Sequence, residues 1–372
     1  MMITANNGFI EQSERYAFDN AGESLKKYIL LQKGELAYNH GASKLRPFGS
    51  CFALTTAESA RIPFVYHCFS AENKNAEFLS IELNGSEVES QLRKIVSSGA
   101  RMDGLLNISF DEYSTVTVLL PDIKEQEHIA DFFRNLDHLI TLHQRKFDKL
   151  QVLKKAMLEK MFPKNGSSVP EIRFKGFTDA WEQRKLGEVV ERITRKNENL
   201  ESTLPLTISA QYGLIDQNEF FDKRIASKDV SGYFLVRNGE FAYNKSTSSD
   251  APWGAIKRLD RYESGVLSTL YIVFKILDER KTSSDYIVTY YNTDLWHKGI
   301  QAIAAEGARN HGLLNVAPAD FFETNLTMPK DYAEQQQIGS FFQMLDHLIT
   351  LHQRELEKLQ NIKKSMLEKM FV

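Results

Sequence analysis

The side chains best suited to a binding chemistry lie in a short polar segment of the second half of the chain. Residues 244–250 (Asn-Lys-Ser-Thr-Ser-Ser-Asp) are followed closely by Lys257 and Arg258. Lysine and arginine can form paired hydrogen bonds with guanine, asparagine with adenine, and serine or threonine with a phosphate or a base. The segment therefore predicts a DNA-reading loop, and the alternative is a solvated turn. The candidate contacts here are Asn244, Lys245, Ser246, Lys257 and Arg258.

A related segment, residues 39–46, lies at the corresponding place in the first half and differs at the positions that would set base preference. Two segments held between glycines, residues 101–103 and 309–311, form a second pair. Their shared arginine is suited to phosphate and its two neighbours to bases. The adjacent residues Asn6 and Asn7 are weaker candidates. The further predicted DNA contacts are Asn39, His40, Lys44, Arg46, Arg101, Asp103, Gln211, Tyr212, Arg309, Asn310 and His311.

These segments belong to two domains that are weak copies of each other. Residues 34–39 (Gly-Glu-Leu-Ala-Tyr-Asn) match residues 239–244 (Gly-Glu-Phe-Ala-Tyr-Asn) at an offset of 205. Further on, the glycines and the Leu-Leu-Asn motif of residues 99–107 match those of residues 307–315 at an offset of 208. Between these anchors the sequences diverge. A shared framework with divergent loops predicts two domains of one fold that bind different sequences.

The elements that position these domains are predicted from a longer repeat. The sequence Asp-His-Leu-Ile-Thr-Leu-His-Gln-Arg occurs at 137–145 and again at 346–354. On extension, residues 125–162 align with residues 334–371 without a gap, and 26 of the 38 positions are identical. Apolar residues recur in both copies with alternating steps of four and three, which is the heptad spacing of paired helices. The sequence predicts two long helices, each about 57 Å in length.

The predicted helix pair would meet along one seam. Two histidines recur within it, and they have two interpretations: metal binding or catalysis, and selection of the helix register. His138 and His143 are five residues apart and do not share a face as a metal-binding pair would, so register selection is favoured. Apolar residues beside the seam predict a further packing partner. The seam is predicted to contain Leu136, Ile140, His143, Leu150, Leu345, Ile349, His352 and Leu359.

Composition limits the classes to which the chain can belong. With 372 residues, 42% hydrophobic and 26% charged, it should hold two soluble domains. No apolar run is long enough for a membrane span, and two cysteines form neither a disulfide framework nor a metal-binding spacing, so we expect a cytoplasmic protein without a membrane partner. A net charge of −3 argues against a basic nucleic-acid coat. Motifs for a phosphate-binding loop or an amino-methyltransferase are absent, so we expect no catalytic residues and no metal site.

These patterns predict an α+β fold: two mixed α/β domains separated by a pair of long antiparallel coiled-coil helices with pseudo-two-fold symmetry. Locally, residues 78–83 predict a strand and residues 182–190 a short helix. The first half has no counterpart of residues 163–206, so its domain is predicted to be shortened at the N-terminus. The predicted boundaries are 1–124 for the first domain, 125–162 for the first helix, 163–170 for a linker, 171–333 for the second domain and 334–372 for the second helix.

Three stretches carry a resemblance to a known family. They are Gln-Gln-Ile-Gly-Ser-Phe-Phe-Gln-Met-Leu-Asp within residues 335–346, Leu-Gln-Asn-Ile-Lys-Lys-Ser-Met-Leu-Glu-Lys-Met-Phe at 359–371, and the Glu-Ile-Arg-Phe-Lys-Gly-Phe and Trp-Glu-Gln-Arg-Lys-Leu-Gly-Glu-Val motifs within 171–189. The first two resemble the repeated regions of type I restriction–modification specificity (S) subunits, and the third their usual lead-in to a target recognition domain. The resemblance covers essentially the whole chain, although the first lead-in departs from the family pattern by its absence.

The resemblance implies a non-catalytic subunit with two target recognition domains. Each would read one half of a bipartite, asymmetric site in double-stranded DNA, while the helices set the spacer and dock methyltransferase (M) subunits. Restriction/translocase (R) subunits would complete the complex, and S-adenosylmethionine, ATP and magnesium are expected on these partners. Two alternatives from other classes are a stand-alone coiled-coil DNA-binding regulator and a bifunctional enzyme with a divergent active site.

Overall fold

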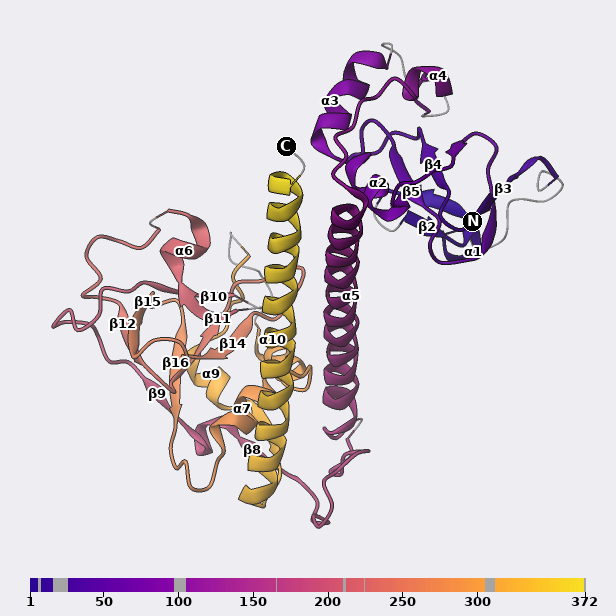
Figure 1. Cartoon of the computed structure of the whole chain (residues 1–372). Helices are drawn as coiled ribbons and strands as arrows, with labels where there is room; N and C mark the ends of the chain where they lie inside the picture. Colours follow the sequence, from indigo (N-terminus) through magenta and orange to yellow (C-terminus); the bar gives the residue numbers. More distant parts are fainter. Residues whose placement is uncertain are drawn as a thin grey trace. The chain divides into compact units, whose positions relative to one another are not determined.

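Figure 1 shows the computed structural model of the chain, with its long helices and two β-rich domains. The chain divides into two compact units, Met1–Lys146 with His352–Val372, and Phe147–Leu351. Each unit contains one domain and part of each long helix. The structure describes residues 1–5, 8–15, 26–96, 105–164, 166–209, 212–223, 225–304 and 312–370.

The first domain is built of small antiparallel sheets with orders β1-β2, β3-β6 and β5-β4-β7. One core cluster gathers around Tyr38 and Phe78, and a second around Leu31 and Ile62. The strands are β1 (Met2–Thr4), β2 (Gly8–Ile10), β3 (Ile29–Gln32), β4 (Leu36–Asn39), β5 (Ser50–Ala53), β6 (Ser59–Ile62) and β7 (His67–Phe69). The helices are α1 (Gln12–Arg15), α2 (Ala76–Glu82), α3 (Ser86–Ile95) and α4 (Phe110–Tyr113).

The second domain has antiparallel sheets with orders β14-β13-β16-β9, β12-β15, β10-β11 and β17-β8. Its larger core cluster includes Trp181, Tyr243 and Phe274. The strands are β8 (Glu182–Lys185), β9 (Val190–Ile193), β10 (Leu206–Ser209), β11 (Gly213–Asp216), β12 (Phe234–Arg237), β13 (Phe241–Asn244), β14 (Ala255–Arg258), β15 (Ser264–Leu267), β16 (Ile272–Ile276) and β17 (Asn325–Met328). The helices are η2 (Leu186–Glu188), α6 (Gln217–Phe221), α7 (Ser284–Tyr290), α8 (His297–Ile303) and α9 (Pro318–Phe322).

The two domains share one framework. Strands β3 to β7 correspond in order and pairing to β12 to β16, and the first residues of all five pairs differ by 205 positions. Helices α2 and α4 correspond to α7 and α9, with first residues 208 positions apart. The anchors recognised in the sequence therefore mark a common fold, and the second domain has three more residues between the starts of β16 and α7 than the first has between the starts of β7 and α2.

Two local predictions were wrong. Residues 78–83 fall largely within α2 instead of a strand, because a run of six mostly apolar residues is too short to separate a half-buried helix from a strand by period. Residues 182–190 form β8, η2 and the start of β9 instead of a helix. The Glu-Gln-Arg-Lys composition favours a helix locally, but pairing with β17 along Glu182–Lys185 overrides that preference.

The two long helices are confirmed as α5 (Ile123–Lys160) and α10 (Tyr332–Met370). Both begin with the same device. The Asp122 carboxylate accepts a hydrogen bond from the Glu125 backbone N–H at 2.9 Å, and the Asp331 carboxylate accepts one from the Ala333 N–H at 2.7 Å. An aspartate at this position satisfies free N–H groups of the first turn and complements the helix dipole.

The helices contact each other in antiparallel orientation. In the first unit, Lys363 Nζ lies 2.5 Å from Asp137 Oδ1, while His352 Nδ1 lies 3.1 Å from His143 Nδ1. In the second unit, Lys154 Nζ lies 2.5 Å from Asp346 Oδ1. As the residue number rises along α5, the number of the contacting residue on α10 falls, which is the pattern of antiparallel helices. Of the predicted seam residues, Leu136 and Leu345 are buried, and Ile140, His143, Leu150, Ile349, His352 and Leu359 are partly buried.

Candidate nucleic-acid interface

The loop between β13 and β14 is closed at its base by a tyrosine and a glycine. Tyr243 is fully buried, and its hydroxyl donates to the Trp253 carbonyl at 2.9 Å. The next residue, Gly254, has φ +80°, and a Cβ there would lie 2.2 Å from the Asn244 carbonyl oxygen. Only glycine permits this close approach of the two ends of the loop. The loop is therefore presented from a rigid base.

The first domain repeats this base. The Tyr38 hydroxyl donates to the Phe48 carbonyl at 2.6 Å, and Gly49 has φ +84° with room for no Cβ beside the Asn39 carbonyl. In both domains burial raises the pKa of the tyrosine well above its usual value, so the hydroxyl keeps its proton and remains a donor. The two loops differ in sequence but start and end on equivalent atoms.

In each domain the first predicted loop contacts residues that lie shortly after the second predicted segment in the sequence. In the second domain, Thr247 N donates to the Gly312 carbonyl at 2.9 Å, and Ser246 forms a bridge with Leu313. In the first domain, Gly41 forms the equivalent bridge with Leu105. Leu105 follows the segment 101–103 by two positions in the sequence, and Gly312 directly follows the segment 309–311. Several predicted residues lie outside the described residues: Asn6, Asn7, Arg101, Asp103, Gln211, Arg309, Asn310 and His311.

Among the described predicted residues, three present exposed side chains: Lys44, Tyr212 and Ser246. Tyr212 stands on the β10–β11 hairpin, where its backbone N–H donates to the Ser209 hydroxyl at 3.2 Å. Lys245 is partly buried, and its Nζ lies 3.5 Å from the Val316 carbonyl. Residues 246–250 form an exposed tip, tightened by paired backbone hydrogen bonds between Ser248 and Ala251.

Other predicted residues form contacts inside their own domains. Asn39 and Asn244 accept a backbone N–H two residues further on through their side-chain oxygens, at 2.9 and 3.0 Å, and so shape the loop from its first residue. His40 is buried, and its two ring nitrogens lie 3.0 and 2.9 Å from the Leu106 and Val65 carbonyls. Arg46 donates to the Asn84 carbonyl at 2.6 Å, and burial lowers its pKa. These side chains hold the loop.

Lys257 and Arg258 also have internal partners. Lys257 Nζ lies 3.1 Å from Asn292 Oδ1, and its pKa is lowered by burial and by the nearby Lys154 of α5. Arg258 pairs with Asp260 at 2.6 Å and Asp285 at 2.9 Å. Both side chains tie β14 to its surroundings within the second unit, and we leave them out of the proposed DNA-reading surface.

Sequence reasoning missed an exposed aromatic pair. Phe220 and Phe221 at the end of α6 are both more than two-fifths exposed, with ring centroids 4.8 Å apart. Helix α6 follows directly on β11, the second strand of the hairpin that carries Tyr212. Two adjacent aromatic residues after a polar segment were the available signal. Large exposed apolar side chains suit a surface that meets a partner.

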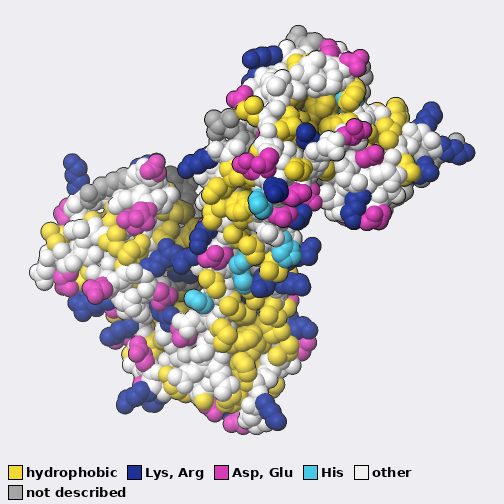
Figure 2. Space-filling view, viewed as in Figure 1, with side chains coloured by type: hydrophobic (Ala, Val, Ile, Leu, Met, Phe, Trp, Pro, Cys, Tyr) yellow, Lys and Arg dark blue, Asp and Glu magenta, His cyan; other side chains and the backbone are white. Residues whose placement is uncertain are grey.

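The long helices expose a different kind of surface. Figure 2 shows hydrophobic side chains gathered over them, with histidines among the hydrophobic groups. On α5, Phe132, Leu139 and Leu153 are exposed at one heptad position beside the seam, and the exposed Lys146 occupies that position between Leu139 and Leu153. Met344, Leu351, Met366 and Met370 are exposed on α10. In the part of the chain that the structure describes, no helix is both long and apolar enough to cross a membrane, and no three His, Cys, Asp or Glu residues gather as a metal site.

Comparison with known proteins gives the class of fold. No protein-family model and no curated protein matches the sequence. The chain is similar to the type I restriction–modification system S subunit from M. genitalium, with a TM-score of 0.54, 12% identity, and coverage of 93% of this chain and 85% of that chain. The chain thus has the fold of a type I specificity subunit.

A weaker likeness is to the HsdS subunit from Thermoanaerobacter tengcongensis, with a TM-score of 0.44 and 15% identity over 92% of this chain and 81% of that one. A further solved structure concerns complex assembly and conformational transition of the type I system, with a TM-score of 0.41 and 14% identity over 92% of this chain and 82% of that one.

Proposed function

We propose that this chain is the DNA sequence-specificity subunit of a type I restriction–modification complex. Each domain would read one half of a bipartite, asymmetric site in double-stranded DNA. The observation that carries the proposal is the repeated loop base, in which Tyr38 with Gly49 and Tyr243 with Gly254 hold loops of different sequence. Equivalent frames with different loops suit two half-sites of different sequence. The likeness in fold to an S subunit supports the same function.

The proposed reading surface of each domain combines two segments of the sequence. In the second domain these are the exposed tip 246–250 and residues 309–311, which precede the contact between Gly312 and Thr247. In the first domain they are the exposed residues around Lys44 and residues 101–103. Serine and threonine hydroxyls can bind phosphates or bases, and lysine and arginine add charge and guanine contacts. A net charge of −3 means that these contacts must be local.

The helix pair would act as spacer and docking surface. Antiparallel pairing fixes the helices through Lys363–Asp137 and Lys154–Asp346, which leaves an exposed apolar stripe at Phe132, Leu139 and Leu153 on α5. An exposed stripe of this kind suits a helical partner, and we propose M subunits as that partner. Methylation of an adenine in a duplex requires the base to be flipped into the pocket of the methylating subunit. S-adenosylmethionine, ATP and magnesium would be bound by the M and R subunits.

Co-expression with the methyltransferase subunit of the same system tests this function. We expect the two proteins to copurify, the complex to methylate DNA at one bipartite sequence, and this chain alone to modify nothing. The paired substitution Leu139→Glu with Leu153→Glu should abolish copurification, because it places charges in the apolar stripe. The control is Lys149→Glu, an exposed change elsewhere on α5. Methylation or cleavage of DNA by the purified chain alone would contradict the proposal.

A further inference from the structure

A buried histidine lies at the start of the predicted DNA-reading loop of the first domain. His40 follows β4 directly and is 7% exposed. Its Nδ1 lies 3.0 Å from the Leu106 carbonyl oxygen, and its Nε2 lies 2.9 Å from the Val65 carbonyl oxygen. The ring therefore ties the loop to two other parts of the domain, the segment around Leu106 and the turn before β7.

The charge of this ring follows from its partners. A carbonyl oxygen only accepts hydrogen bonds, and a neutral imidazole has a single N–H group, so a neutral ring can donate to one of the two carbonyls and not to both. Its other nitrogen would then face the second carbonyl with lone pair against lone pair. The imidazolium ion has an N–H group at both nitrogens and can donate to both carbonyls. The observed geometry of His40 is therefore that of a protonated histidine.

The second domain has a lysine at the same place. Lys245 directly follows β13 and is the counterpart of His40 at an offset of 205. The backbone contact is equivalent, because the Leu314 N–H donates to the Lys245 carbonyl at 2.9 Å. In the first domain the Leu106 N–H donates to the His40 carbonyl at 2.8 Å. Each domain thus has a basic side chain at this position, but only histidine ordinarily loses its charge in the neutral pH range.

The groups beside His40 add no negative charge. Its titratable neighbours are Tyr38 on β4, with ring centroids 6.4 Å apart, and His67 on β7, with centroids 5.0 Å apart. Burial raises the pKa of Tyr38 well above its usual value, so the phenol is neutral. Burial lowers the pKa of His67, the Ile108 carbonyl opposes this, and the charge of His40 lowers it further. Among the described residues, His40 forms no ion pair.

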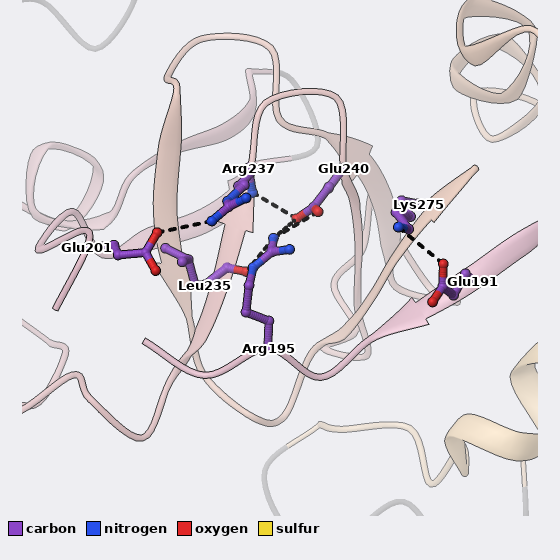
Figure 3. A network of polar contacts seen from close by, with 7 residues as sticks. All are labelled: Glu191, Arg195, Glu201, Leu235, Arg237, Glu240 and Lys275. Carbon is purple, nitrogen blue, oxygen red and sulfur yellow. Dashed lines mark hydrogen bonds and ion pairs between the residues drawn. The ribbon is translucent and has the colours of Figure 1, made fainter. Parts of the chain in front are cut away.

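A charged group of the second domain shows the contrast. Figure 3 shows Arg195 beside Glu240, whose two carboxylate oxygens both lie 2.8 Å from the guanidinium. Glu240 is 7% exposed, as His40 is. Arginine is charged at every physiological pH, and here a carboxylate balances that charge. His40 is held by carbonyl dipoles alone, so the proton on its ring is the one that the pH of the solvent can remove.

We propose that His40, in its imidazolium form, is the positioning residue of the first loop, so that the first domain reads its half-site in a pH-dependent way and the second domain does not. Loss of the ring proton breaks the contact with Leu106 or with Val65 and releases the loop on that side. Because the held loop carries the proton, it is favoured as the pH falls and is lost as the pH rises. The DNA part of this inference rests on the proposed function, whereas the link between the proton and the loop does not.

The first test needs no DNA. In the full chain with nitrogen-15 histidine, the NMR shifts of the ring nitrogens report the charge of His40 between pH 6 and pH 8.5. We expect an imidazolium at pH 6. As the ring loses its proton, protection of the Leu106 amide from hydrogen exchange should fall about tenfold beyond the intrinsic effect of pH, which is the scale of one hydrogen bond to a charged group. A neutral ring at pH 6, or equal protection of Leu106 in both forms, would overturn the proposal.

Exchanges between the domains separate the charge from the packing. His40→Lys should keep the protection of Leu106 at pH 6 and at pH 8.5, whereas the uncharged His40→Gln should lose about tenfold at both. Lys245→His should transfer the pH dependence to the Leu314 amide, and the exposed control His128→Gln should leave both amides as in the wild type. Equal protection of Leu106 in His40→Lys and His40→Gln at pH 8.5 would contradict the role of the charge. If His40→Lys does not fold, the wild-type titration decides.

The second test uses the complex with the methyltransferase subunit and DNAs mismatched in one half-site or the other. The ratio of methylation rates on matched and mismatched DNA cancels the effect of pH on the chemistry. We expect this ratio to fall about tenfold from pH 6 to pH 8.5 for one half-site and to stay constant for the other, and His40→Lys to remove the difference. Constant ratios for both half-sites would overturn the DNA part of the proposal, and the NMR and exchange results distinguish this from a failure of the His40 contacts.

Discussion

Among the residues that the structure describes, the central sheet of the second domain has four strands, β14-β13-β16-β9, whereas the corresponding sheet of the first domain has three, β5-β4-β7. The loop bases on these sheets are nevertheless equivalent, since each is closed by a tyrosine hydroxyl and a glycine with positive φ. The geometry that presents a loop is therefore set locally, between two strands. The fourth strand of the second domain comes from a segment that is distant in sequence from the loop, so the loop base and the sheet edge can be changed separately.

The largest expected difference between the domains concerns Glu334, which is 1% exposed. Its carboxylate accepts two hydrogen bonds from Arg173, at 2.6 and 2.7 Å, and one from Trp181 Nε1 at 3.3 Å. Glu334→Ala leaves the arginine without its partner and should destabilise the second domain by about 3–5 kcal/mol. The counterpart Glu125 is exposed, and Glu125→Ala should cost within about 0.5 kcal/mol. Urea unfolding monitored by hydrogen exchange reports the stability of each domain separately. Equal losses of stability for the two substitutions would contradict the expected difference between the domains.

The next effect concerns the glycine of the loop base. Gly254→Ala forces a Cβ against the Asn244 carbonyl at positive φ, and should cost about 3 kcal/mol. Gly49→Ala in the first domain should cost a similar amount. The control Gly239→Ala has a similar φ, +82°, but an added Cβ meets nothing within 4 Å, so it should cost about 1 kcal/mol. If Gly254→Ala reduced the free energy of unfolding no more than Gly239→Ala does, the close approach at the loop base would be contradicted.

The helix pair allows a comparison of two related ion pairs. Lys154–Asp346 has side-chain exposures of 24% and 44%, and Lys363–Asp137 has 35% and 52%. Double-mutant cycles with alanine should give coupling energies of about 0.5–1 kcal/mol for each pair, since both are partly screened by water. The less exposed pair should couple more strongly. A larger coupling for Lys363–Asp137 would contradict this ranking.

The smallest effect is a pH dependence from the histidine pair. Burial, followed by the charges of His143 and Lys146, lowers the pKa of His352 below its ordinary 6.5. The unfolded chain therefore binds more protons just below pH 6.5, and stability should fall as the pH is lowered through that window and stay unaffected above it. His352→Gln should remove this component, whereas the exposed control His347→Gln should keep it. Urea midpoints at pH 8 and pH 5.5 give the comparison.

The sequence was sufficient for the parts of the fold that repeat. Heptad spacing located both long helices within two residues of their observed ends, because a long amphipathic period is a strong signal. The offset between residues 34–39 and 239–244 identified equivalent strands. Residues 182–190 were harder, since their composition is helical and Glu182–Lys185 becomes a strand only through pairing with β17. The helix preference of a short segment carries no information about the distant strand with which that segment pairs.

The equivalence of the candidate loops was predictable from the sequence, and the directions of their side chains were not. The sequence placed residues 39–46 and 244–250 in equivalent loops, and the structure places them so. It could not show that His40 lies buried between two carbonyls or that Arg258 pairs with Asp260 and Asp285. A polar residue type has the same chemistry whether it faces solvent or a buried carbonyl, so its direction is set by tertiary packing.

The most direct test of the account is an exchange of the second domain. Residues 208–330 would be replaced by the equivalent residues of another chain of this fold with a known recognition sequence, and the bases methylated by the resulting complex would be mapped by methylome sequencing. The account predicts that one half of the bipartite site changes to that of the donor, while the other half and the spacer are retained. A change in both halves, or no change in either, would contradict the assignment of one half-site to each domain.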